Sequence, residues 1–216
     1  MSKTALIAPV DNILGITLFH RLLRSNYSVV AGYTGDEFRV DVSEYEDRCV
    51  TQAWNPRSYV SGRSLVLETL NRFGHIDAAM LVAEAGYPDE AVHEMSPLTI
   101  ERGIDSSALG PVLLAREMLA ALIKQGTGRL SLVTHIPEDQ TPTLLANIAA
   151  SAMSALGESL MVEYGDRSIA IDTFESKKTD VPGYAEFILS VDGRNGDGKI
   201  HRFGAGVLPK LSLRGR

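Results

Sequence analysis

The stretch from Ala5 to Phe19 reads ALIAPVDNILGITLF and has the pattern of a strand, a turn and a helix. Its first residues form a short apolar run, which is typical of a buried strand. Ile13, Ile16 and Leu18 then follow at helical spacing. In parallel sheets, a turn of this kind is where the amino end of a helix receives the phosphate groups of a ligand. The fold class depends on whether the same unit repeats along the chain.

Apolar strands and amphipathic helices alternate along the rest of the sequence. The expected strands cover residues 4–10, 27–33, 49–54, 76–86, 128–135, 168–174 and part of 194–204. The expected helices cover residues 12–25, 63–73, 99–125 with an interruption at Gly110-Pro111, 142–164 and 181–191. The strands are nearly continuous apolar runs, as expected when both faces of a sheet are covered. The pattern predicts a doubly wound, parallel α/β sheet in one domain over residues 1–206, with a tail at 207–216.

Composition excludes several classes of function. The chain has 216 residues and a net charge of −6, which disfavours binding to nucleic acid. Its single cysteine, Cys49, excludes an internal disulfide and a cysteine-based zinc site, and we interpret it as a packing residue. No apolar run reaches the ~18 residues of a membrane span, so we expect a cytoplasmic protein with no membrane partner.

Three segments resemble the short-chain dehydrogenase/reductase superfamily. RFGHIDAAMLVAEAG (72–86) is similar to that family's FGxIDxLVNNAG, with Glu84 in place of the second asparagine. GIDSSALGPVLLAREML (103–119) is similar to the helix that carries a family asparagine. ESLMVEYGDRSIAIDTF (158–174) is similar to the family's SLAxEYGxxxIRVNxV. The resemblance implies a Rossmann-like fold from about Lys3 to Gly204. We expect Glu84 to be a solvated loop charge.

The resemblance also implies a cofactor turn, which this sequence alters. The family's TGxxxGxG falls on residues 8–15, so its glycines correspond to Pro9, Ile13 and Gly15. Pro9 has no N–H to offer a phosphate, and Ile13 adds a branched side chain. Asp11 places a negative charge beside an anion site. We therefore expect the turn to bind no cofactor and merely to link a strand to a helix.

The family's catalytic residues are missing as well. The resemblance places its tyrosine at Ala146, its lysine at Ala150, its serine near His135 and its asparagine at Ser107. The motif YxxxK occurs nowhere in the sequence. Because general acid–base catalysis contributes roughly 10²–10⁴ in rate, the usual mechanism loses its main component. After residue 174 the chain also passes almost directly to the next helix, so the family's substrate loop is shortened.

The small residues of the helix at Pro142–Tyr164 indicate an interaction surface instead. In the resembled family, this helix and the one at Gly110–Lys124 form contacts between subunits. The sequence therefore predicts a non-catalytic subunit that assembles with an active, homologous dehydrogenase, such as one acting on a hydroxyacyl-CoA.

Two other functions stay open at this point. One is an atypical reductase whose site has moved to His135 and the carboxylates that follow it. The other is a ligand-binding or regulatory module. The five histidines show no metal-ligand spacing, so no metal site is expected.

Overall fold

All strands of the sheet run in the same direction in the structure, which is a computed structural model describing residues 2–35, 38, 40–83, 90–191 and 198–204. The strand order is β3-β2-β1-β4-β5-β6-β7, with every pair parallel. The strands are β1 (Thr4–Ala8), β2 (Ser28–Tyr33), β3 (Cys49–Ala53), β4 (Ala78–Val82), β5 (Arg129–His135), β6 (Ala170–Ser176) and β7 (Ile200–Phe203). The predicted doubly wound sheet is confirmed, and the expected tail at 207–216 lies outside the described residues.

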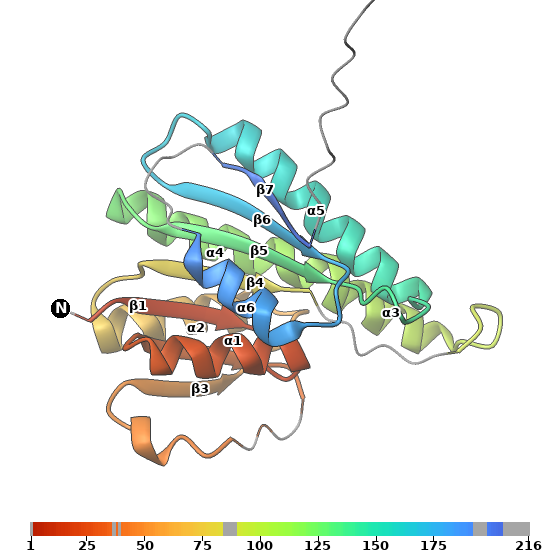
Figure 1. The fold of residues 1–216 in the computed structure, drawn as a ribbon, viewed down its shortest axis with the longest axis horizontal. Helices are drawn as coiled ribbons and strands as arrows, with labels where there is room; N and C mark the ends of the chain where they lie inside the picture. Colours follow the sequence, from red (N-terminus) through yellow and green to blue (C-terminus); the bar gives the residue numbers. More distant parts are fainter. Residues whose placement is uncertain (1, 36–37, 39, 84–89, 192–197, 205–216) are drawn as a thin grey trace, which may run out of the picture.

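Helices cover both faces of this sheet (Figure 1). They are α1 (Ile13–Arg24), α2 (Tyr59–Phe73), α3 (Pro97–Ile104), α4 (Gly110–Gln125), α5 (Leu144–Tyr164) and α6 (Val181–Ser190). One core lies between the sheet and α1 with α6, and a second lies between the sheet and α2, α4 and α5. The carboxyl ends of the strands therefore meet at one edge, on the right in Figure 1.

Local capping explains where several helices begin and end. The side chain of Ser58 accepts a hydrogen bond from the backbone N–H of Ser61, so α2 begins at Tyr59, four residues earlier than its apolar pattern predicts. Gly74, with φ of 83°, ends the same helix as predicted. Thr143 caps α5, so this helix begins at Leu144 rather than at Pro142.

The long helical region after β4 departs from the expectation in one place. Its interruption is a π-helical turn, η2 (Asp105–Leu109), whereas Gly110 and Pro111 begin α4. Proline fits the first turn of a helix because it needs no N–H bond there, so it marks a start rather than a break. The residue in the asparagine position of the family, Ser107, therefore lies in the irregular turn.

Two helical regions, 97–125 and 144–164, are long and apolar enough to cross a membrane by composition alone. Both regions pack against the parallel sheet or against each other, which explains their apolar character. Several small residues of α5 serve the same packing. Ala149 is buried, and a side chain at Gly157 would clash with Thr173 of β6. The small residues thus bring α5 close to its own sheet.

Candidate functional site

The turn between β1 and α1 brings Pro9, Asp11, Ile13 and Gly15 together, as the sequence predicts. The side chain of Asn12 caps α1 by accepting a hydrogen bond from the N–H of Gly15, at 2.7 Å. A Cβ atom on Gly15 would lie 2.9 Å from the Cα of Val10 and closer still to a backbone oxygen. Glycine is therefore required here by the contact between the helix and the turn.

Asp11 is bound to the end of the neighbouring strand β2. Its Oδ2 accepts hydrogen bonds from the N–H of Thr34 at 2.9 Å and the hydroxyl of Thr34 at 2.8 Å. A third hydrogen bond comes from the N–H of Gly35, also at 2.8 Å. One carboxylate oxygen thus gathers three donors at the place where two strands end. The turn is closed by a side chain of the protein itself.

This turn does not fit the diphosphate of a nicotinamide dinucleotide, the cofactor that the fold implies. Pro9 removes an N–H donor from the turn. The charge of Asp11 repels an anion, and its hydrogen bonds hold it in the turn. Ile13, whose side chain is 76% exposed, stands at the first position of α1, where the family has glycine. The amino end of α1 is preserved, but the space beside it, where a phosphate group would lie, is altered in charge and shape.

The positions of the family's tyrosine and lysine both lie on α5. Ala146 is buried, with 7% exposure, and Ala150 lines a cleft between α5 and the ends of β5 and β6. The asparagine position, Ser107, lies in η2, which packs against α5. Its hydroxyl is buried and has no hydrogen-bond partner among the described residues. The three positions meet around α5, but they carry no acid or base.

His135 faces away from this cleft. Its Nε2 lies 2.8 Å from the backbone oxygen of Lys178, and its ring lies 5.9 Å from the ring of Tyr184. Tyr184 is fully buried, donates its hydroxyl to the backbone oxygen of Thr134, and has its pKa raised by burial. His135 and Tyr184 therefore hold the end of β5 against α6. The structure does not form a reaction site centred on His135.

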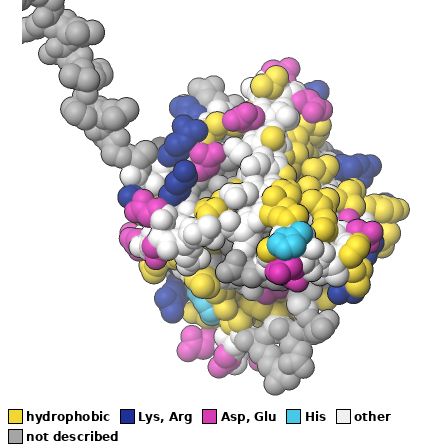
Figure 2. Space-filling view, turned by 90° about the vertical axis from the view of Figure 1, so that its right-hand side faces the viewer, with side chains coloured by type: hydrophobic (Ala, Val, Ile, Leu, Met, Phe, Trp, Pro, Cys, Tyr) yellow, Lys and Arg dark blue, Asp and Glu magenta, His cyan; other side chains and the backbone are white. Residues whose placement is uncertain are grey.

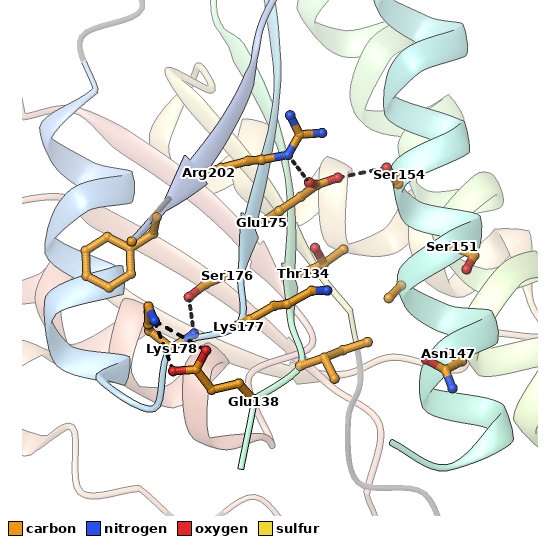
Figure 3. A pocket seen from close by; sticks show the side chains of 14 residues that line it. Thr134, Glu138, Asn147, Ser151, Ser154, Glu175, Ser176, Lys177, Lys178 and Arg202 are labelled. Carbon is orange, nitrogen blue, oxygen red and sulfur yellow. Dashed lines mark hydrogen bonds and ion pairs between the residues drawn. The ribbon is translucent and has the colours of Figure 1, made fainter. Parts of the chain in front are cut away.

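The cleft itself has a volume of about 550 Å³ and opens at the carboxyl ends of β5, β6 and β7. Figure 2 shows this side of the molecule, where basic and acidic side chains lie next to one another and hydrophobic side chains gather on another part. Figure 3 shows α5 forming one wall and the strand ends forming the other. The polar side chains that line it belong to Thr134, Glu138, Asn147, Ser151, Ser154, Glu175, Ser176, Lys177, Lys178 and Arg202.

Two ion pairs organise the charges of the cleft. Glu175 lies between the two walls, because it accepts hydrogen bonds from Ser154 at 2.9 Å and from Arg202 at 3.0 Å. Lys178 bonds both carboxylate oxygens of Glu138, at 3.0 and 3.3 Å. Sequence reasoning pointed to the carboxylates after His135, which include Glu138, but it missed Glu175, Lys178 and Arg202. The available signal was their place at or just beyond the carboxyl ends of parallel strands, where ligands bind.

Other predicted features have no part in the cleft. The β6–α6 connection is short, and Pro182 and Gly183 lie in the first turn of α6, as expected. Burial raises the pKa of the Cys49 thiol to about 11, consistent with a packing residue. No group of three or more His, Cys, Asp or Glu side chains forms a metal site among the described residues. Glu84 lies outside those residues.

No family model matches the chain, but comparison with known proteins finds relatives among dehydrogenases and reductases. The chain is 23% identical over 197 residues to acetoacetyl-CoA reductase of Paracoccus denitrificans, covering 89% of this chain and 78% of that one. It is 26% identical over 151 residues to dehydrogenase/reductase SDR family member 7B of Bos taurus. The chain spans 43% of the length of that second relative.

Solved structures agree with these relatives. ElxO with NADP bound superimposes with a TM-score of 0.77 at 16% identity, covering 94% of this chain and 97% of that one. The chain is therefore similar in sequence and in fold to short-chain dehydrogenases/reductases. A variant of actinorhodin polyketide ketoreductase with NADPH gives a TM-score of 0.75 at 15% identity, covering 93% of this chain and 95% of that one. The family's sheet is thus retained.

The expectation of a non-catalytic subunit is wrong, because a relative and a solved structure that this chain resembles are named as reductases. That expectation rested on the lost tyrosine and lysine at Ala146 and Ala150. The loss removes the usual acid–base pair, but a cleft remains at the same place on α5. The absence of one set of residues was therefore too narrow a basis for excluding a reaction.

Proposed function

We propose that the chain is a reductase that acts on a carbonyl compound bound in the cleft between α5 and the ends of β5 and β6. The observation that carries this proposal is the position of the cleft. It opens at the carboxyl ends of parallel strands and is lined by Ala150, the position of the family's lysine. Acetoacetyl-CoA reductase and ketoreductase relatives support a carbonyl substrate.

Small residues on α5 make room for such a substrate. Ala150, Ser151 and Ser154 line the cleft where the larger family side chains are missing. Its volume of about 550 Å³ lies within the usual range for sites that bind small molecules. The substrate would therefore lie closer to the helix than side chains of tyrosine and lysine would allow.

The side chains around the cleft provide hydrogen bonds and charge. Glu175 is held by Ser154 and Arg202, so the two walls keep a fixed spacing. Thr134 donates its hydroxyl to the backbone oxygen of Phe174, at 3.2 Å, so its hydroxyl oxygen can still accept a hydrogen bond. These groups can bind and orient a polar substrate. Because the β1–α1 turn fits the dinucleotide poorly, we derive no chemical step through that cofactor.

The test is a turnover assay with the full chain. Acetoacetyl-CoA, acetoacetate and a panel of small ketones are incubated with NADPH or NADH at millimolar concentration, since weak binding of the cofactor is expected. Mass spectrometry detects the alcohol product. We expect product from the wild type and none from Ala150→Phe, which fills the cleft. A matched variant, Ala155→Phe, places the same ring on an exposed position of α5 outside the cleft lining and should keep activity.

Circular dichroism verifies that both variants fold. Absence of product from every substrate with both cofactors would contradict the proposal. Ligand binding without turnover would instead favour a ligand-binding module.

We also propose that α4 and α5 associate with a second dehydrogenase-type chain. Their outer surfaces carry exposed apolar side chains, including Val112 at 48% and Val162 at 88% exposure. Exposed apolar groups of this kind favour contact with another protein when they lie close together.

A further inference from the structure

The charges that line the cleft do not balance. Its basic side chains are Lys177, Lys178 and Arg202, and its acidic ones are Glu138 and Glu175. Lys178 is paired with Glu138, and Arg202 is paired with Glu175. No ion pair or hydrogen bond joins the ammonium of Lys177 to a described residue. The cleft therefore contains one positive charge without a counter-ion among the residues that the structure describes.

The backbone around Lys177 is held at the end of β6. The N–H of Glu138 donates a hydrogen bond to the backbone oxygen of Lys177 at 2.6 Å. The N–H of Lys178 donates to the hydroxyl of Ser176 at 3.1 Å. Strand alternation then places Lys177 on the same side as Glu175 and Thr173, toward α5. Lys178 emerges on the opposite side, toward Glu138.

The direction of the Lys177 side chain is visible in Figure 3. It extends from the strand end across the cleft toward α5, whereas the amine of Lys178 turns to Glu138. Across the cleft, α5 contributes Asn147 and Ser151, one helical turn apart, which are polar but uncharged. The ammonium of Lys177 therefore faces a wall that offers hydrogen bonds and no competing negative charge.

We propose that Lys177 binds the carboxylate of the substrate, which makes the substrate a small oxo acid rather than a neutral ketone. A single uncompensated ammonium matches the single charge of a carboxylate. A phosphate group carries more charge and is usually met by several donors, such as an arginine fork or a helix amino end. Here the arginine of the cleft, Arg202, is already paired with Glu175.

Bound in this way, the carboxylate fixes one end of the substrate, and the carbonyl group extends toward Thr134 and α5. Lys177 acts as a specificity-determining residue. This inference rests on the proposed function for the reaction, but binding of the acid needs neither a cofactor nor turnover. The two proposals can therefore fail separately.

The experiment compares a charged ligand with its neutral ester. Acetoacetate and methyl acetoacetate differ by one negative charge and are titrated separately, without cofactor, into the full chain by NMR. We expect acetoacetate to bind the wild type at least tenfold more tightly than its methyl ester does. Lys177→Gln should remove this preference, and Lys177→Arg should keep it.

Lys124→Gln is the matched control. Lys124 is exposed near the end of α4, outside the cleft lining, and its loss changes the net charge of the protein equally. This variant should bind acetoacetate within twofold of the wild type. Because Lys177 is exposed, its substitution should leave the circular dichroism spectrum unchanged.

Three results of the titrations with acetoacetate and its ester would overturn the proposal. They are no detectable binding of acetoacetate, equal affinity for the acid and its ester, and an unchanged preference in Lys177→Gln. Inorganic phosphate is the final probe. If phosphate binds more tightly than acetoacetate and depends on Lys177, the site is a phosphate site and the oxo-acid assignment is wrong. If acetoacetate binds as expected but no product forms in the turnover assay, the carboxylate site stands and only the proposed reductase activity is rejected.

Discussion

Two places at the same edge of the sheet carry their charges in opposite ways. At the end of β1, the carboxylate of Asp11 accepts three hydrogen bonds from Thr34 and Gly35 and closes the turn. At the end of β6, the ammonium of Lys177 extends into an open cleft. The first charge is satisfied within the protein, whereas the second has no protein counter-ion among the described residues. This difference supports our proposal that ligand recognition lies at β6 rather than at the turn after β1.

The first prediction tests how tightly the closed turn is packed. Gly15→Ala should lower the free energy of unfolding by about 2–3 kcal/mol, because the added methyl group meets backbone atoms. Gly35→Ala is the control in the same region, since among the described residues its Cβ would meet only the Asp11 carboxylate, at 3.5 Å. Urea unfolding measures both. If both variants lose the same free energy of unfolding, the turn accommodates the added methyl group more easily than its geometry indicates.

The second prediction concerns affinity for the dinucleotide. Calorimetry should give no micromolar dissociation constant for NADPH with the wild type. The combined variant Pro9→Gly, Asp11→Ser, Ile13→Gly should bind it at least about tenfold more tightly, equivalent to about 1.4 kcal/mol. Nicotinamide riboside, which lacks a diphosphate, should bind both proteins alike. Micromolar affinity in the wild type would mean that the closed turn admits the diphosphate.

The third prediction isolates the Asp11 hydrogen bonds. Asp11→Ala should lower the free energy of unfolding by about 1 kcal/mol, because solvent replaces part of what the three donors lose. Asp41 provides the comparison, since it is also exposed and, among the described residues, bonds only its near neighbour Ser43. Asp41→Ala should cost less in the same urea experiment. A larger effect at Asp41 would contradict the proposed link between the ends of β1 and β2.

The fourth prediction has the smallest effect on the chain alone. Val162→Ser should change the free energy of unfolding by less than about 0.5 kcal/mol, because the valine is 88% exposed. If α5 associates with another chain through this side, the same substitution should weaken that assembly. Light scattering after size-exclusion chromatography measures it, with the homologous dehydrogenases co-expressed. A monomeric wild type under these conditions would reject the association.

Most of the fold could be predicted because apolar spacing reports which side of each element is buried. The strands and helices follow that spacing, and the errors fall at helix ends, where single side chains such as Ser58 and Thr143 decide the start. The π-helical turn at Asp105–Leu109 was missed because Gly110-Pro111 gave a stronger local signal, although proline begins α4.

Less of the site could be predicted, because its contacts join distant parts of the chain. The sequence shows Asp11 in the turn but not that Thr34 and Gly35 close on it. The family's catalytic positions fall on Ala146 and Ala150, and no family position marks Lys177. Lys177 can be identified as a cleft residue only from the structure, in which the ends of β5 and β6 and the helix α5 surround its side chain.

The hydrogen bonds of Asp11 also bear on how long the protein survives. A protein whose turn is completed by a bound dinucleotide is stabilised by mass action whenever that ligand is abundant. Here the turn is completed by a carboxylate that is part of the chain. Its resistance to proteolysis should therefore not depend on the supply of nicotinamide cofactor in the cell.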